Sequence, residues 1–290
     1  MARFWRWAMR ALKTKMLEDL ALRGMSPETA RQYVGAVRGF AQWHCRSPEQ
    51  KGLVEIRQYL LHLREVRVAS PSKRKLAVAG IKFLYGVTLA RPDVVATLPW
   101  PRVPYNLPEI MSENEVARLL GCARDPRVRV MLMLAYAAGL RITEVCRLQV
   151  ADIDSKRGVI RIRQGKGARD RETLLPATLL AELRRYWLWA RPSGPWLFPA
   201  RKGHAGQHAA GLGFRLAAAR AGITRNVTFH SLRHAFATHL LSRGVEMRVL
   251  QVMMGHRDLK TTSRYAFVRT DLLAKVPDLL AGFPISEQKL

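Results

Sequence analysis

The sequence predicts a mainly α-helical protein of two domains with one small antiparallel β-sheet. Apolar residues recur at helical spacing over most of the 290 residues. Strand-like alternation is confined to one stretch, where Val159, Ile160 and Ile162 alternate with Arg161 and Arg163. Five prolines between residues 91 and 108 separate two segments that are each long enough to bury a core.

Three helices are expected in the N-terminal segment. Ser26-Pro27 is typical of an N-cap followed by a first-turn proline, and it begins a helix that reaches Trp43. A second helix is expected over Leu53–Leu63. A third begins at Ser70-Pro71 and carries a basic face. That face is either a contact for a polyanionic partner or merely solvated, and its candidate contact residues are Lys73, Arg74 and Lys75.

The proline-rich stretch predicts an extended linker, because proline interrupts helices and central strands. The expected domain limits are therefore 1–90 for a helical N-terminal domain, 91–110 for the linker and 111–290 for a second domain.

The second domain opens at Ser112, whose sequence with Glu115 is that of a capping box. Asp125-Pro126 begins a helix with the apolar run Val128–Ala138, which we expect to be central core and to stop at Gly139. The alternating strand is followed by a turn at 164–167 and by a second strand that ends near Pro176. Further helices are expected over residues 177–190, 208–221, 231–242, 246–253 and 258–265.

Charge and cysteine content limit the class of protein. The chain has 49 Lys and Arg against 22 Asp and Glu, a formal net charge of +27. Residues 1–90 alone have 17 basic against 6 acidic residues, so the excess is not confined to a tail. A polyanion such as DNA or RNA is the expected partner, with an acidic membrane surface as the alternative.

Three widely spaced cysteines indicate buried free thiols in a reducing cytoplasm rather than a disulfide framework or a metal site. Residues 1–10 mix Trp and Phe with Arg and do not have the pattern of a secretory signal. No apolar run is long enough to predict a transmembrane helix.

Two basic residues follow glycines that can hold them in place. Arg141 comes after Gly139, and the backbone there could fix it; the alternative is a surface arginine paired with Glu144. Lys166 lies between Gly165 and Gly167, where a hairpin tip could bring it to a phosphate; the alternative is a solvated turn lysine.

Two further segments hold candidate residues nearer the C-terminus. If Ser231 caps a helix, His230 and Arg233 can face one point near its positive end and bind a phosphate, whereas His234 and His239 are expected to be structural. His256 and Tyr265 flank a short expected helix that would bring them together. A lone tyrosine in such a place is otherwise a half-buried packing residue.

Taken together, these residues resemble the tyrosine recombinase (phage integrase) family. The similar segments are AGLRITEVCRL, QGKGARDRETLLP, HSLRHAFATHLL and MGHRDLKTTSRYAFV, and they are most similar to the Xer and integron-integrase branches. SPETARQYVGAVRGFAQW resembles the helical core-binding domain of the family, and the resemblance covers residues 15–275. Phe267 departs from the pattern, since the family more often has a histidine there.

The resemblance implies a clamp of two domains on DNA, a core-binding domain and a tyrosine recombinase catalytic domain. Tyr265 would be the nucleophile that forms a 3′-phosphotyrosyl link, and Lys166 would protonate the leaving 5′ oxygen. Arg141, Arg233 and His256 would bind the phosphate oxygens, and His230 would assist proton transfer. The overall positive charge, and not the resemblance, favours Lys73, Arg74 and Lys75 as DNA contacts.

The same resemblance implies no metal, ATP or other cofactor. The partners would be double-stranded DNA recombination sites and three further subunits, in a homotetramer or in a heterotetramer with a related recombinase. This assembly would act through a Holliday junction, associated with the nucleoid of a bacterial-type cytoplasm and with no membrane. An apolar C-terminal segment is expected either to dock on a neighbouring subunit or to pack on its own domain: Leu272, Leu273, Val276, Leu279, Leu280 and Phe283.

Three other functions remain open from the sequence. A non-catalytic DNA-binding protein could descend from a recombinase, and a topoisomerase IB-like enzyme could use the same chemistry to relax DNA. A basic structural protein of the ribosome or of chromatin would share the charge.

Overall fold

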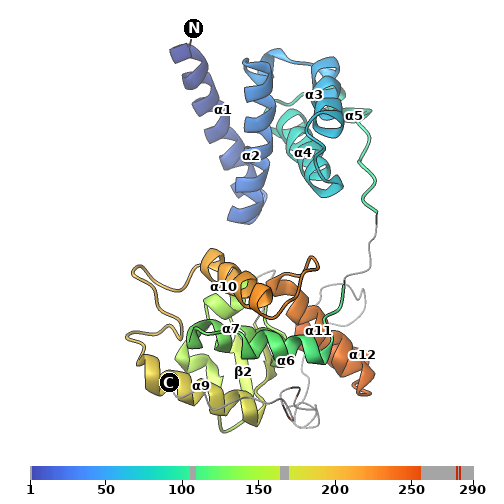
Figure 1. Cartoon of the computed structure of the whole chain (residues 1–290). Helices are drawn as coiled ribbons and strands as arrows, with labels where there is room; N and C mark the ends of the chain where they lie inside the picture. Colours follow the sequence, from blue (N-terminus) through green and yellow to red (C-terminus); the bar gives the residue numbers. More distant parts are fainter. Residues whose placement is uncertain (1, 105–108, 164–169, 256–278, 280, 282–290) are drawn as a thin grey trace. The chain divides into compact units, whose positions relative to one another are not determined.

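The computed structural model describes residues 2–104, 109–163, 170–255, 279 and 281. The chain divides into two compact units, Met1–Asn106 and Leu107–Leu290, which are described separately (Figure 1). The protein is mostly helical with one small antiparallel sheet, as the sequence predicts.

In its described residues the N-terminal unit contains helices and turns and no strand. Its elements are α1 (Ala2–Leu22), α2 (Pro27–His44), a 3-10 turn (Pro48–Gln50), α3 (Leu53–Glu65), α4 (Pro71–Phe83), a π-helical turn (Leu84–Thr88) and α5 (Asp93–Ala96). The side chain of Ser26 accepts a hydrogen bond from the backbone N–H of Thr29, and that of Ser70 accepts one from Lys73. Both predicted N-caps are therefore confirmed.

Helices α2 and α4 cross in close contact inside this unit. A Cβ added at Gly80 would lie 3.0 Å from the carbonyl oxygen of Tyr33 and 3.1 Å from the Cβ of Ala36. The absence of a side chain at Gly80 thus lets the two helices approach. Around this crossing lies the core, in which Phe40, Ile56 and Ile81 are completely buried.

Two features of the N-terminal unit differ from the sequence expectation. Helix α1 was not predicted. Residues 93–96 form α5 instead of extended linker, and Val94, Val95 and Leu98 are buried in the N-terminal core. Burial of these three apolar side chains stabilises a short helix between two prolines. The domain limits 1–90, 91–110 and 111–290, and the role expected of each part, stay predictions.

The second unit surrounds α7 with helices and places the sheet beside them (Figure 1). Its elements are α6 (Glu113–Gly121), α7 (Pro126–Ala137), α8 (Ile142–Cys146), a 3-10 turn (Val150–Asp152), β1 (Ile153–Asp154), β2 (Val159–Ile162), β3 (Arg171–Leu174), α9 (Ala177–Ala190), α10 (Gln207–Arg220), α11 (Phe229–Ser242) and α12 (Met247–Met254). The capping box of Ser112 and Glu115 and the N-cap at Asp125 are as predicted. Every residue from Arg129 to Ala137 is buried, so α7 is the central helix.

The sheet has the order β1-β2-β3, and both pairs are antiparallel. Ile160 pairs with Thr173, and Arg161 with Glu172. The predicted strand is confirmed: Val159, Ile160 and Ile162 are buried, and Arg161 and Arg163 are exposed. The first strand, β1, is too short to leave a signal in the sequence.

Three smaller expectations can be compared with the described residues. All three cysteines are free, but only Cys146 is buried; Cys45 is exposed, so the expectation of buried thiols is wrong there. Leu279 is fully buried in the core of the second unit, so this residue packs on its own domain. Within the described ranges, no helix is long and apolar enough to cross a membrane.

Candidate active site

Arg141 lies at the N-terminus of α8, two residues after a glycine with a left-handed backbone. Gly139 has a φ of +66°, and a Cβ there would lie 2.5 Å from the Cε1 of Phe236. The backbone N–H of Arg141 donates to Oε2 of Glu144 at 2.8 Å, and its Nη1 donates to Oε1 at 2.9 Å. The pairing with Glu144 is therefore present, yet 21% of the Arg141 side chain remains exposed.

Arg233 comes from α11 and is almost completely buried. Its side chain is 1% exposed, and its Nη1 and Nη2 donate to the carbonyl oxygens of Gly139 and Met254. Nη1 also lies 3.8 Å from Oε2 of Glu144. These contacts tie α11 to the start of α8 and to the end of α12.

The first turn of α11 differs from the expected one. The N-cap is Thr228, and Ser231 is the third helical residue, whose hydroxyl accepts a hydrogen bond from the backbone N–H of Thr228. The helix thus begins earlier than a cap at Ser231 would allow, and Phe229 is buried as its first residue. His230 and Arg233 still share one side of α11, because residues three apart on a helix are neighbours.

The histidines of α11 have different surroundings. His230 is exposed, and its ring packs edge-on against that of His234, with 4.6 Å between ring centroids. Burial and the charge of Arg233 lower the pKa of His234. His239 is buried, and its Nδ1 lies 3.0 Å from the hydroxyl oxygen of Tyr136, so its surroundings fit the expected structural role.

Three guanidinium groups contact or lie near one carboxylate at the centre of this site, that of Glu144. Arg171, the first residue of β3, donates from Nη1 to Oε1 of Glu144 at 2.8 Å and from Nη2 to Oε2 at 2.7 Å. Arg141 and Arg233 approach the same carboxylate from α8 and α11. Three positive charges and one negative charge therefore lie together with little solvent around them.

The charge state of this cluster follows from its contacts. Burial alone would raise the pKa of Glu144, but the hydrogen bonds and charge of Arg171 and the hydrogen bonds of Arg141 lower it to about 2. Burial and the charge of Arg141 lower the pKa of Arg233 to about 9, although Glu144 acts in the opposite direction. Glu144 and Arg233 are therefore both ionised at neutral pH. Three guanidinium groups against one carboxylate give the cluster an excess of positive charge that an anion can neutralise.

The remaining predicted catalytic residues lie outside the described part of the chain. Lys166 belongs to the connection between β2 and β3, His256 follows α12, and Tyr265 comes nine residues later. The structure does place the positions next to His256. Arg171 and Arg233 hold the last two carbonyl groups of α12, which ends two residues before His256.

Sequence reasoning missed the roles of Glu144 and Arg171. Glu144 entered only as a surface partner of Arg141, and Arg171 was not singled out. A strand residue whose contacts are made with α8 and α12 leaves no local signal. An acid three residues after an arginine at a helix start is the one available cue, since it is also the spacing of a capping box.

The predicted DNA contacts on α4 differ in their exposure. Lys73 and Lys75 are exposed, and Arg74 is half-buried. Their role in binding stays a prediction.

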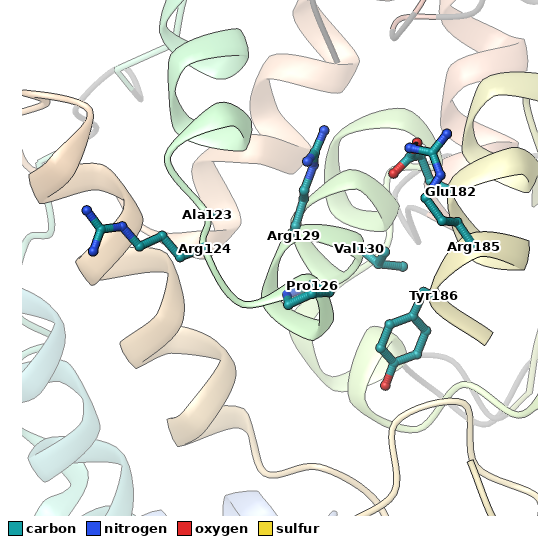
Figure 2. Close-up of a pocket in the computed structure, with 8 residues that line it drawn as sticks. All are labelled: Ala123, Arg124, Pro126, Arg129, Val130, Glu182, Arg185 and Tyr186. Carbon is teal, nitrogen blue, oxygen red and sulfur yellow. Dashed lines mark ion pairs between the residues drawn. The ribbon is translucent and has the colours of Figure 1, made fainter. Parts of the chain in front are cut away.

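Cavities of the second unit that are lined by described residues include the following two. One of about 240 Å³ opens beside Glu144 and has Arg147, Arg161 and Arg163 among its lining residues. The other, of about 30 Å³, lies between the start of α7 and α9 (Figure 2). It has room for about two water molecules, contains none of the predicted site residues, and is bordered by an ion pair between Arg185 Nη1 and Glu182 Oε1 at 2.9 Å. No group of His, Cys, Asp and Glu in the described ranges is arranged to hold a metal ion.

The described part of this site is a cluster of three guanidinium groups around the carboxylate of Glu144, on a mainly helical unit. The sequence matches the model of the phage integrase family over residues 109–271, and that of the phage integrase N-terminal SAM-like domain over residues 12–92. The chain belongs to the phage integrase family, whose named relatives include tyrosine recombinases.

Individual relatives cover most of the chain. It is 41% identical over 266 residues to the integrase/recombinase homologue y4qK of Sinorhizobium fredii, with 91% of this chain and 86% of that protein covered. It is 34% identical over 265 residues to the tyrosine recombinase XerA of Thermococcus kodakarensis, with 89% and 91% covered. A solved structure of lambda integrase (residues 75–356), a dimer bound to a COC′ core site, has a TM-score of 0.70 at 17% identity and covers 86% of this chain and 94% of that one. At that identity the likeness concerns the fold.

Proposed function

We propose that this chain cuts and rejoins DNA strands at specific recombination sites, with Tyr265 as the nucleophile. The observation that carries the proposal is the meeting of Arg141 and Arg233 at one carboxylate, although they come from α8 and α11. Two guanidinium groups in a water-poor site can stabilise the negative charge that develops on the non-bridging oxygens of a phosphodiester. Membership of the family supports the same chemistry.

In the cleavage step the phenolic oxygen of Tyr265 attacks the phosphorus, and the bond from phosphorus to the 5′ oxygen breaks. His230 accepts the phenolic proton, and Lys166 donates a proton to the leaving 5′ oxygen. Arg141, Arg233 and His256 bind the non-bridging oxygens. The products are a 3′-phosphotyrosyl link and a free 5′ hydroxyl, so no bond energy is lost to water.

In the rejoining step a 5′ hydroxyl from a partner duplex attacks the phosphotyrosyl link and releases Tyr265. Proton transfers run in reverse, and neither ATP nor a metal ion takes part. Strand exchange between two duplexes requires four active sites, which we assign to a homotetramer, or a heterotetramer with a related recombinase, on a Holliday junction. Structures of lambda integrase as a dimer bound to a COC′ core site and as a tetramer bound to a Holliday junction support this assembly.

The two units would close on DNA as a clamp, with Lys73, Arg74 and Lys75 among its contacts. The net charge of +27 supports a polyanionic partner. A protein of this kind would act on the nucleoid in a bacterial-type cytoplasm.

A two-stage experiment tests the proposal. Sheared genomic DNA from the source organism is incubated with the protein, and covalent complexes are trapped with detergent and sequenced to locate the cut site. A duplex with that site and a nick beside it then serves as a suicide substrate. We expect a protein–DNA adduct from the natural chain, no adduct from Tyr265→Phe, and a normal adduct from the control Tyr33→Phe in the N-terminal unit.

The products distinguish the other functions. Junctions between two duplexes indicate recombination, whereas relaxed circles without junctions would indicate a topoisomerase. An adduct that persists in Tyr265→Phe, or the lack of any adduct from the natural chain, would contradict the proposal.

A further inference from the structure

Arg171 has a position in the site that its sequence neighbours do not explain. Its side chain is 10% exposed, and all three of its guanidinium nitrogen atoms have partners. Nη1 and Nη2 donate to the two carboxylate oxygens of Glu144, and Nε donates to the carbonyl oxygen of Met253 at 2.9 Å. All three guanidinium nitrogen atoms of Arg171 therefore hold groups of the protein.

We propose that Arg171 is a positioning residue of the phosphate-binding site: it holds the carboxylate of Glu144 in a two-pronged pair, so that neither Arg141 nor Arg233 forms that pair with it. This inference rests on the proposed function. It identifies the residue that keeps Arg141 and Arg233 in a state to bind the phosphate.

The first argument is competition for Glu144. A carboxylate can accept a two-pronged pair from one guanidinium, and such a pair is the strongest of its contacts. Glu144 forms this two-pronged pair with Arg171. Arg141 has one side-chain hydrogen bond to Glu144, and Nη1 of Arg233 lies 3.8 Å from its Oε2. Without Arg171 the same carboxylate would be free to form the pair with Arg141 or Arg233. The phosphate would then have to displace Glu144.

The second argument is the set of elements that Arg171 joins. It connects β3, α8 and the last turn of α12 through one planar group. Arg141 is the N-cap residue of α8. Along the chain, Lys166 comes five residues before β3 and His256 comes two residues after α12. A Cβ at Gly255 would lie 2.9 Å from the Cδ of Arg171, so the C-cap residue of α12 packs directly against this side chain.

The third argument is electrostatic. Arg171 adds a third positive charge beside one negative charge, and its charge contributes to the lowered pKa of Arg233. The site therefore keeps an excess positive charge while Glu144 is ionised. Lysine cannot replace this arrangement, because an ammonium group has no planar fork with which to bind both carboxylate oxygens and a carbonyl together.

The test uses three variants at the site and one matched control. These are Arg171→Met, Arg171→Lys, the double variant Arg171→Met with Glu144→Gln, and Arg225→Met. Arg225 also joins a carboxylate and a carbonyl in the second unit, since its Nε donates to Glu115 at 3.0 Å and its Nη2 to the carbonyl oxygen of Ile110 at 3.0 Å. Its contacts in the described ranges include none of the proposed catalytic residues.

Two quantities are measured for each variant: the rate of adduct formation on the suicide duplex, and the shift in melting temperature caused by orthovanadate, an analogue of the phosphate in transfer. We expect Arg171→Met to lower the adduct rate about 100-fold, in the range of a lost stabilising donor, while DNA affinity changes less than about 3-fold. The vanadate shift is lost as well. Arg171→Lys recovers little of either quantity.

The double variant separates positioning from mere stability. Its neutral glutamine amide at position 144 has no charge with which to hold Arg141 or Arg233. We therefore expect at least a roughly tenfold recovery of the adduct rate and a restored vanadate shift, even if the melting temperature falls further. A double variant no better than Arg171→Met, or an Arg225→Met variant equally impaired, would overturn the proposal. If the natural chain forms no adduct, the proposed function fails, and the vanadate shifts still decide the role of Arg171.

Discussion

The guanidinium of Arg233 donates a hydrogen bond to the carbonyl oxygen of Gly139, 94 residues earlier in the chain. This carbonyl is presented by a backbone with φ at +66°, which an L residue rarely adopts. The ring of Phe236, one helical turn after Arg233, fills the space in which a side chain at position 139 would lie. Backbone conformation, core packing and the position of a proposed catalytic arginine are thus coupled at one glycine.

Gly139→Ala should therefore destabilise the protein and impair cleavage. We expect about 1 kcal/mol from the left-handed backbone and a further ~1–3 kcal/mol from the clash with Phe236. Urea unfolding measures the loss. Gly244→Ala is the matched control, because Gly244 has a φ of +84° but nothing within 4 Å of its added Cβ. Equal losses in the two variants would show that the Phe236 contact has no energetic effect.

Acid should remove the contribution of Glu144 to stability. Its pKa is lowered from 4.5 to about 2 in the folded protein, so the unfolded chain binds more protons between these values. The contribution of Glu144 to the free energy of unfolding is fully present above pH 4.5, and it is lost as the pH falls toward 2. The full contribution is about 3 kcal/mol, since one pKa unit corresponds to ~1.4 kcal/mol.

Unfolding of Glu144→Gln and of the natural chain between about pH 2 and 6 measures this contribution. The two proteins should differ most above pH 4.5 and converge near pH 2. Glu172→Gln is the control, because its pair with Arg157 is largely exposed and is expected to contribute little. A difference between Glu144→Gln and the natural chain that does not vary with pH would contradict the ionised state of Glu144.

Removal of the exposed lysines on α4 should weaken DNA binding in a salt-dependent way. We expect the double variant Lys73→Ala with Lys75→Ala to reduce the slope of log affinity against log salt by about 2, one for each lost phosphate contact. Fluorescence anisotropy at several salt concentrations measures the slope. Arg31→Ala with Arg157→Ala removes the same charge from residues that are ion-paired to Glu28 and Glu172. An equal change in slope in this control would mean that net charge, and not the α4 face, determines binding.

Local signals explain which parts of the fold the sequence predicted. The starts of α2, α4, α6 and α7 depend on caps and prolines within a few residues, so each was predicted at its observed place. The start of α11 was misplaced because Thr228 and Ser231 are both possible caps, and the burial of Phe229 favours the earlier one. Helix α5 depends on burial of Val94 and Val95 in a distant core, which no local pattern reveals.

The residues of the site also divide into those with a local sequence signal and those that only tertiary packing brings together. Arg141 and Arg233 could be recognised from the sequence around them, and the structure brings both to Glu144. Arg171 could not, because its partners are 27 and 82 residues away and are chosen by tertiary packing. Lys166, His256 and Tyr265 stay predictions.

The most direct measurement is the identification of the amino acid that becomes attached to DNA. Adducts formed on the suicide duplex are digested with nuclease and protease, and the peptide that retains a nucleotide is sequenced by mass spectrometry. We predict a single modified peptide with the nucleotide on the phenolic oxygen of Tyr265. A nucleotide on any other residue, or a fully active Tyr265→Phe protein, would contradict the account.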